Sequence, residues 1–409
     1  MPSNTDFLKI HPVDPERLYP LKEFDQLVLS YCASTPPKTS IEVQARVQLT
    51  DGRMTQWFSW GIWSPFADRH SINSSDEFAA MDTDTLTLKN DLLAHAVQVR
   101  ILAQGNTPAV DSIYLAVKNR KAPCEETLPV PRSISVPTPG YSQMVRDSRI
   151  GGVICSATTI AMLLGQKGEN VLPEEIALHN YDSAYDGCGN WSFSTACAAS
   201  YGYEAYLRFA DLQDVYQELS AGHAVGASVQ YTKDPDHPKL PYLENAPCNT
   251  FGHLLVICGF ETDAAGRSYV IAHDPAAESN AAVERRYPLE QFLRAWSNRL
   301  IYVVHPSSET ATRTAPVRVP ATLKKAQMEE TFELFSNGEP IHPMADSSFP
   351  SSVICWITDR KGMYDADCDF AYGSVTPDGL LNLPGYNGEE LFVITNRGTI
   401  YHVPANNSI

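Results

Sequence analysis

The chain has 409 residues, a length that predicts roughly two to three domains. Hydrophobic residues make up 43% and aromatic residues 10%, a composition typical of folded globular proteins. The formal net charge is −17, from 31 Lys and Arg against 48 Asp and Glu, and no basic cluster interrupts this excess. Nucleic acid is therefore excluded as an expected partner, because its phosphates would be repelled.

The N-terminal residues and the cysteines indicate the compartment. Residues 1–20 hold four prolines and no apolar run of signal-peptide length, and no stretch approaches the roughly 18 apolar residues of a membrane span. The nine cysteines are odd in number and scattered, which predicts neither a disulfide framework nor a zinc knuckle. We therefore expect a cytoplasmic protein with no membrane span, no cofactor and no metal.

Two proline-rich stretches, Lys121–Gly140 and His305–Pro320, indicate connectors, because proline interrupts both helices and central strands. They predict an α+β, multidomain chain. Its expected segments are an N-terminal β-sandwich over 1–120, a linker over 121–135, a central domain over 136–306, a linker over 307–325 and a small C-terminal mixed or β domain over 326–409.

The sandwich prediction depends on short alternating runs separated by turns. Apolar residues alternate along Ser40–Leu49, and Ala96–Ala103 and Asp111–Val117 are further strand-like runs. A tryptophan cluster lies between these runs, and it has two interpretations: core packing, which we favour, or a platform for a sugar face. Its members are Trp57, Trp60 and Trp63.

Strands also dominate the C-terminal segment. Runs at Val353–Thr358, Leu391–Thr395 and Thr399–Val403 predict strands, with a tight hairpin turn at Asn396–Gly398 between the last two. A short helix is expected over Met328–Phe335. No residue spacing in this segment indicates chemistry.

The central segment holds a cysteine in a reactive position. Residues 156–165 have the apolar spacing of a helix, formed by Ala157, Ile160, Ala161 and Leu164. Cys155 therefore lies at the helix N-terminus, where unpaired N–H groups favour a thiolate. An isolated cysteine at such a place is more often a buried small hydrophobe, so the rest of the segment decides.

A histidine and an aspartate are expected to meet beside this cysteine. The run Leu254–Phe260 and the run Ser268–Ala272 predict two antiparallel strands joined by a turn centred near Ala264. His253 precedes that centre by eleven residues and Asp274 follows it by ten, so both reach the same open end of the hairpin. A carboxylate there would orient the imidazole and stabilise its charged form.

Three other residue sets are alternative candidates for a nucleophile, a base or a metal site. Cys188, in Gly187–Trp191, resembles the surroundings of the papain nucleophile, but Asn190 occupies the reactive position and a helix is expected over Ser192–Tyr201. Strand alternation turns His273 away from the Asp274 side. A zinc site from Cys248, His253 and Cys258 lacks a fourth ligand and suitable spacing.

Four sequence stretches together resemble papain-like cysteine peptidases, in particular the branch that trims double-glycine bacteriocin leaders. They are Tyr141–Gln143, Ile154–Thr159, Gly252–Val256 and His273–Pro275. Over about residues 136–306, the resemblance implies a papain-like fold with Cys155 as nucleophile, His253 as general base, Asp274 as its orienting residue and Gln143 as an oxyanion-hole donor. The sequence departs from the pattern in the long gap between Gln143 and Cys155, and in Ser156, where the motif commonly has Gly.

The expected function is a cysteine-dependent hydrolase, a peptidase or amidase, that acts through a thioester acyl-enzyme on a peptide or amide substrate. One alternative is an inactive papain-like protein whose N-terminal domain binds a glycan or protein. Another is a thiol acyltransferase that passes the acyl group to an amine. Because all four site residues lie between Gln143 and Asp274, a fragment over about Pro131–Ser307 is expected to contain the complete chemistry.

Overall fold

The computed structural model describes residues 1–307 except 37–38, 66–68, 106–107, 124–131, 147–149, 170 and 172, and beyond residue 307 the strands β18 to β26. Strands outnumber helices in these residues. The helices are α1 (Cys155–Gln166), α2 (Pro173–Asn180), α3 (Trp191–Ser200), α4 (Leu212–Ser220) and α5 (Leu289–Ala295), with a 3-10 turn η1 (Asn280–Ala282). Within the described residues, no helix has both the length and the apolarity to cross a membrane.

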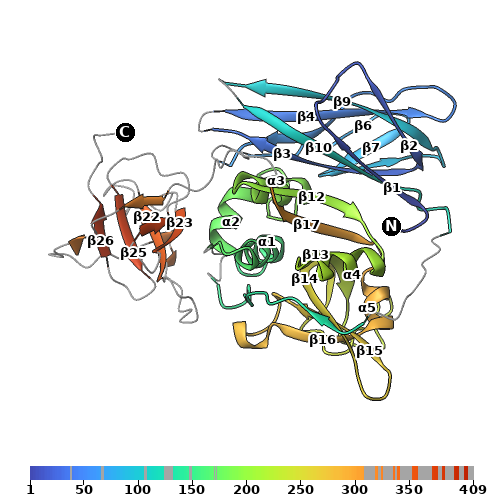
Figure 1. The fold of residues 1–409 in the computed structure, drawn as a ribbon. Coiled ribbons are helices and arrows are strands. Elements are labelled where there is room, and N and C mark those ends of the chain that lie inside the picture. The colour runs from blue at the N-terminus through green and yellow to red at the C-terminus, as the bar shows by residue number, and fades with distance from the viewer. Residues whose placement is uncertain are drawn as a thin grey trace.

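The N-terminal part forms two antiparallel sheets, which lie above the central part in Figure 1. The first has six strands, ordered β1 (Thr5–Ile10), β10 (Ala109–Lys118), β3 (Gln26–Ser34), β8 (Thr85–Leu88), β7 (Ala79–Asp82) and β6 (Ser74–Ser75). The second has four, ordered β2 (Leu18–Phe24), β9 (Ala94–Gln104), β4 (Ser40–Leu49) and β5 (Phe58–Trp63). The three predicted strand runs coincide with β4, β9 and β10, and burial alternates along β4.

The tryptophan cluster divides between core and surface. The side chains of Trp60 and Trp63 are completely buried, so the core interpretation holds for both. The Trp60 indole N–H donates to the Asp84 carbonyl at 2.9 Å, which ties the four-stranded sheet to the turn between β7 and β8 of the other sheet. Trp57 is partly exposed and lies against the guanidinium groups of Arg46 and Arg100. A three-tryptophan sugar platform is therefore absent.

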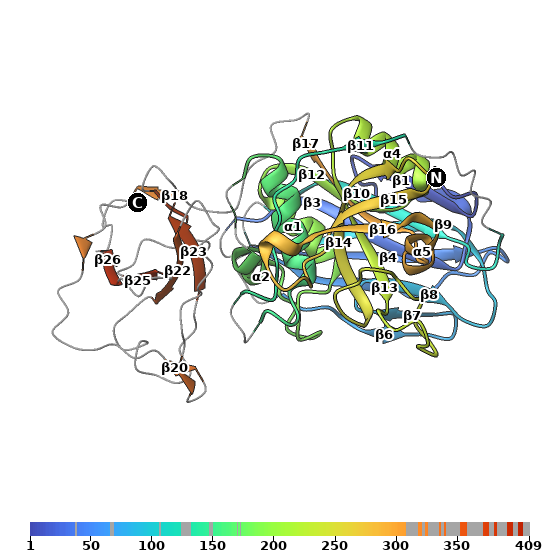
Figure 2. The same cartoon turned by 90° about the horizontal axis from the view of Figure 1, so that it is seen from below.

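The central part is built on a third antiparallel sheet, which has seven strands. Its strands follow the order β12 (Tyr203–Phe209), β17 (Leu300–Pro306), β13 (Val225–Tyr231), β14 (Thr250–Thr262), β15 (Ser268–His273) and β16 (Glu284–Pro288), with β11 (Ile134–Ser135) paired to β14. Figure 2 shows β14, β15 and β16 of this sheet from below. Because β11 pairs with β14, the sheet reaches into the segment expected to be a linker. Gly259 permits this approach, since a Cβ there would lie 2.5 Å from the Ile134 carbonyl oxygen.

The predicted hairpin is formed by β14 and β15. Thr262 pairs with Ser268, which places the centre at Ala265, one residue later than expected. The strand pairing shifts by one residue between Ile257 and Gly259. Nearer the open end, the midpoint between paired residues therefore lies half a residue earlier, between Ala264 and Ala265. The hairpin prediction is confirmed, and the open end carries the histidine and the aspartate.

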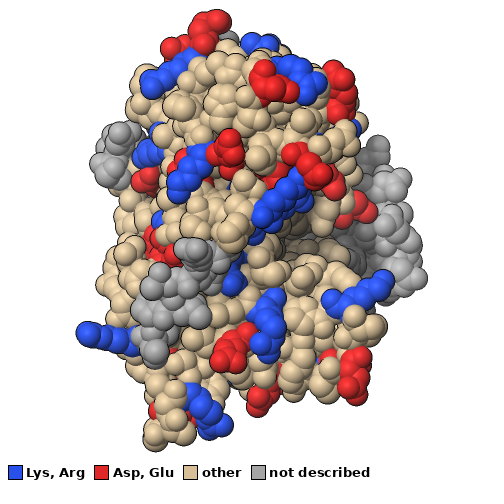
Figure 3. Space-filling model, turned by 90° about the vertical axis from the view of Figure 1, so that its right-hand side faces the viewer, with Lys and Arg blue, Asp and Glu red and all other residues tan. Residues whose placement is uncertain are grey.

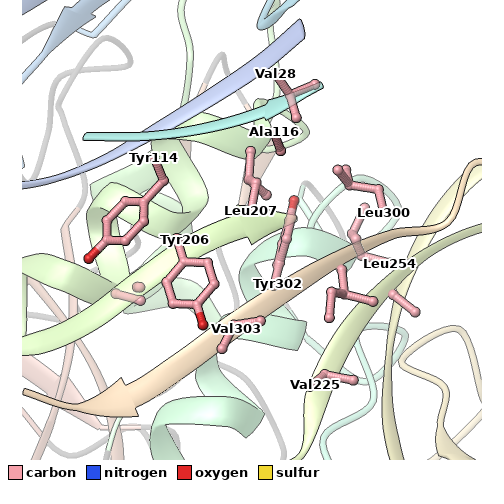
Figure 4. Packing of buried hydrophobic residues seen from close by; sticks show 14 of the residues in the cluster. Val28, Tyr114, Ala116, Tyr206, Leu207, Val225, Leu254, Leu300, Tyr302 and Val303 are labelled. Carbon is pink, nitrogen blue, oxygen red and sulfur yellow. The ribbon is translucent and has the colours of Figure 1, made fainter. Parts of the chain in front are cut away.

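The N-terminal and central parts share one hydrophobic core. The rings of Tyr114 on β10 and Tyr206 on β12 stack with centroids 4.7 Å apart. Figure 4 shows Val28 and Ala116 from the N-terminal sheet above Leu207 of the central sheet. The interface between the two parts is therefore as apolar as the interior of a single domain, and separating them would expose buried hydrophobic side chains to water.

A further seven-stranded sheet follows residue 307. Its order is β18 (Arg318–Pro320), β24 (Leu380–Asn382), β23 (Ala371–Val375), β22 (Ser352–Ile357), β25 (Leu391–Thr395), β26 (Ile400–Val403) and β19 (Lys324–Lys325), and β20 (Phe335–Ser336) pairs with β21 (Glu339–Pro340). The strands predicted near β22, β25 and β26 are present, and β25 and β26 are antiparallel. The turn at Asn396–Gly398 and all but the last residue of the predicted helix Met328–Phe335 lie outside the described residues.

Candidate active site

Cys155 is the first residue of α1, as the helical spacing predicts. Ile154 at the N-cap gives no side-chain hydrogen bond, and the first turn contains no acidic residue. The N–H groups at the start of this helix are thus left without a side-chain acceptor from the cap, and they present a positive end to the sulfur. The thiol is partly exposed, so a reactant can approach it.

His253 and Asp274 meet at the open end of the hairpin. The imidazole Nε2 lies 2.8 Å from Asp274 Oδ1, and both side chains are buried. The second carboxylate oxygen accepts hydrogen bonds from the hydroxyls of Tyr231 at 2.8 Å and Tyr287 at 2.7 Å. With these donors the fully buried carboxylate is satisfied, and the imidazole is held with its other nitrogen free to face the thiol.

The three groups shift each other's proton affinity. Burial alone would raise the pKa of the Cys155 thiol, but the hydrogen bond and the charge of His253 bring it below its ordinary value. Burial would lower the pKa of His253, whereas Asp274 and Cys155 raise it well above the usual value. Burial would raise the pKa of Asp274, and His253 with the two tyrosine hydroxyls lowers it. The arrangement favours a thiolate beside an imidazolium.

Gln143 lies between two segments of the site. Its side chain is buried, and its amide Nε2 donates to the Gly151 carbonyl at 2.7 Å. Its backbone N–H donates to the Pro275 carbonyl at 2.8 Å. Gln143 therefore joins the loop before Cys155 to the residue after Asp274.

The alternative residues occupy structural positions. The Cys188 thiol is buried and points to the Ala177 carbonyl, and burial raises its pKa to about 12. Asn190 is the N-cap of α3, where its side chain accepts from the Phe193 N–H. His273 has its Nδ1 at 3.1 Å from the Pro139 carbonyl. Each of these side chains is engaged in a structural contact.

Cys258, one of the three residues considered for a zinc site, also has a structural contact. Burial raises the pKa of Cys258 to about 12, and its thiol lies against the Ile271 carbonyl. Across the described part of the chain, no group of three or more His, Cys, Asp or Glu side chains is placed to hold a metal ion.

A pocket of about 730 Å³ opens over Cys155 and His253, and both domains line it. The N-terminal part contributes the turn between β7 and β8 and the outer residues of β8, namely Asp82, Thr83, Asp84, Thr85 and Thr87. The lining residues of the central part include Tyr185, Asp186 and Trp191. We call the lining residues from β7 and β8 the β7–β8 wall. This wall lies outside the fragment Pro131–Ser307, so that fragment has the expected triad but only part of the pocket.

Sequence reasoning missed the wall from β7 and β8. The run Asp82–Thr85 is recognisable as a polar turn between two short strands. Nothing local relates it to Cys155, because the contact that places it runs from the Asp84 carboxylate to the Trp191 N–H, 107 residues later. Only the packing of the two domains brings the turn to the pocket.

Comparison with known proteins agrees with this division. Residues 136–300 match the Peptidase_C39 like family, and residues 17–116 match the Peptidase C39 N-terminal domain. No curated protein matches the chain. A solved structure described as a C39-like peptidase from Bacillus anthracis is 17% identical, covers 44% of this chain and 100% of its own, and has a TM-score of 0.33. The papain-like resemblance of the central segment, in its C39 peptidase branch, is confirmed by the family match.

Proposed function

We propose that the protein is a cysteine-dependent hydrolase of peptide or amide bonds, with Cys155 as nucleophile, His253 as general acid and base, and Asp274 as the residue that orients the imidazole. The observation that carries the proposal is the buried His253–Asp274 pair at 2.8 Å, coupled to a cysteine thiol at a helix N-terminus. The match of residues 136–300 to a peptidase family supports the same reaction class.

The reaction would proceed in two halves. The Cys155 thiolate attacks the carbonyl carbon, and the His253 imidazolium gives its proton to the departing amine. A thioester between Cys155 and the acyl group remains. His253 then takes a proton from water, the resulting hydroxide equivalent attacks the thioester, and the carboxylic acid leaves as the Cys155 thiolate and the His253 imidazolium are restored.

The negative charge that forms on the substrate oxygen needs donors near the start of α1. The Cys155 backbone N–H lies there, among first-turn N–H groups that the N-cap side chain leaves open. The remaining amide hydrogen of Gln143 is the second proposed donor, because the other hydrogen is held by Gly151. Preorganised donors of this kind typically contribute about 10²- to 10³-fold to the rate.

The test is thiol-dependent turnover of a peptide pool by the full chain, read by mass spectrometry. Cys155→Ala is expected to abolish turnover. The matched control is Cys248→Ala, because Cys248 is another partly exposed thiol, 4.0 Å from the Tyr231 hydroxyl, and burial raises its pKa. Turnover that survives in Cys155→Ala, or is lost equally in both variants while both stay folded, would contradict the assignment.

A further inference from the structure

The wall from β7 and β8 is fixed in place by bonds to both domains. The Thr83 N–H donates to Asn73 Oδ1 at 2.7 Å, and the Trp60 indole holds the Asp84 carbonyl. The Asp84 carboxylate accepts from the Trp191 N–H of α3 and from the Thr85 hydroxyl. Thr83 adopts a positive φ of 56°, which a threonine rarely does without such restraint. The turn is therefore a preorganised surface of the pocket.

The charge of the pocket differs from that of the outer surface. Three of the described lining residues carry carboxylates, and none is Lys or Arg. By contrast, Lys and Arg are interspersed with Asp and Glu over the face of the molecule shown in Figure 3. The pocket is thus acidic beyond what the mixed surface would give, and low-dielectric walls strengthen the field inside it.

Asp82 is the carboxylate of this wall that is most available to a ligand. It is exposed, and its Oδ1 accepts a hydrogen bond from the neighbouring Thr83 hydroxyl at 3.3 Å. Asp84 is already engaged by α3, and Asp186 of the central part accepts from the Tyr181 hydroxyl at 2.5 Å. Asp82 lines the same pocket as the Cys155 thiol, so the negative charge of Asp82 acts on a substrate bound at the sulfur.

We propose that the β7–β8 wall selects substrates, and that Asp82 receives a cationic side chain, that of Lys or Arg, from the peptide whose carbonyl Cys155 attacks. This inference rests on the proposed function and deepens it. It gives the N-terminal domain a direct part in recognition, because the acidic wall comes from that domain. The hydroxyls of Thr83, Thr85 and Thr87 supply neutral hydrogen-bonding groups beside the charge.

The first test uses Cys155 as its own probe and needs no known substrate. The full chain is treated near pH 6 with 2-(trimethylammonium)ethyl methanethiosulfonate or with the 2-sulfonatoethyl reagent, and modification of the Cys155 peptide is followed by mass spectrometry. The thiolate itself favours the cationic reagent, so the readout is the change in the rate ratio on mutation. Asp82→Asn is expected to lower the cation-to-anion ratio by about three- to tenfold.

The control is Asp91→Asn, which removes the same charge from the same domain. Asp91 is highly exposed, forms an ion pair with Lys121 and does not line the pocket. Its variant should leave the ratio unchanged. An equal fall in both variants would mean that only the overall charge acts, and an unchanged ratio in Asp82→Asn would overturn the proposal.

The second test digests a random peptide library with the full chain. The wild type should enrich Lys or Arg at one position near the cleaved bond, and Asp82→Asn should remove the enrichment. Cleavage without any basic preference would overturn the cationic subsite while leaving the hydrolase intact. A Cys155 that reacts with neither reagent near pH 6, together with no cleavage, would instead refute the proposed function.

Discussion

Two helices begin at the same pocket, and their first turns are treated in opposite ways. At the start of α1 the N-cap Ile154 offers no side-chain acceptor, and the group beside the helix end is the Cys155 thiol. At the start of α3, Asn190 accepts the Phe193 N–H and the carboxylate of Asp84, from the other domain, accepts the Trp191 N–H. The first-turn N–H groups of α1 have no side-chain acceptor from the N-cap, whereas two first-turn N–H groups of α3 are bound by side-chain acceptors.

The acidic groups at these two ends also shift in opposite directions. Burial is the largest single contribution for both and would raise both pKa values, yet the hydrogen bond and charge of His253 bring the pKa of Cys155 below its ordinary value. Burial raises the pKa of Asp84 to about 7, although the Trp191 N–H and the Thr85 hydroxyl lower it, and the charge of Asp182 raises it further. The difference teaches that a positive helix end does not by itself keep a buried acid ionised, and that a counter-charge decides.

Removing the counter-charge at α1 tests this conclusion most severely. In His253→Ala the burial of Cys155 is no longer offset, so its pKa should rise above the ordinary value. Turnover should fall by about 10⁴- to 10⁶-fold, because the general base is lost together with the thiolate. The rate of Cys155 alkylation by iodoacetamide, measured from pH 5 to 9, should show its midpoint moved to higher pH. A midpoint that stays below that of an ordinary thiol would mean that the helix end alone sustains the thiolate.

Asp274→Asn sharpens the comparison by keeping the imidazole while removing the charge behind it. The Asp274 carboxylate holds Nε2 of His253 and is itself held by two tyrosine hydroxyls. Loss of its charge should reduce turnover by about 10²- to 10⁴-fold, because the imidazole loses its orientation and the stabilisation of its protonated form.

Alkylation of Cys155 should be affected less than turnover by Asp274→Asn, because alkylation needs the thiolate and not a complete proton-transfer cycle. Both rates are measured on the same preparation near pH 6. Equal losses in the two assays would contradict a purely orienting role and would assign Asp274 to holding the thiolate as well.

The extent to which sequence predicts the site follows from the range of the interactions. The helical period predicts the place of Cys155, and the symmetry of one hairpin predicts that His253 and Asp274 meet; both are local patterns. The family resemblance adds the order of the motifs and implies that Gln143 is a donor. The bridge that Gln143 forms between Gly151 and Pro275 depends on tertiary packing.

The part of the pocket that sequence missed depends on contacts between distant segments. Alternation in β4 predicts a sheet with one buried face, but it does not say what covers β3 or β10. Those strands are buried along most of their length because the central domain packs on them. The same packing brings Asp84 to α3, and no local pattern in the Asp82–Thr85 turn predicts this contact.

The last test acts on the start of α3, where Asp84→Asn replaces the acceptor of the Trp191 N–H by a neutral residue of similar shape. Because the pKa of Asp84 in the folded chain is raised to about 7, the folded state binds this proton more tightly than the unfolded state. The stabilisation is fully present below the ordinary pKa near 4 and is lost as the pH rises through 7. The difference in unfolding free energy between wild type and Asp84→Asn should therefore fall between pH 5 and pH 8, by on the order of 2 to 3 kcal/mol.

Urea unfolding of the full chain at both pH values measures this difference, and shared effects of other titrating groups cancel in it. The control Asp91→Asn should show no such change over the same range, because the ion pair with Lys121 holds the pKa of Asp91 below its ordinary value, already beneath pH 5. If the wild type and Asp84→Asn run parallel from pH 5 to 8, the start of α3 keeps Asp84 ionised without a counter-charge. The contrast between the two helix ends would then come from the caps alone, and the role given to His253 in holding the thiolate would need to be reassessed.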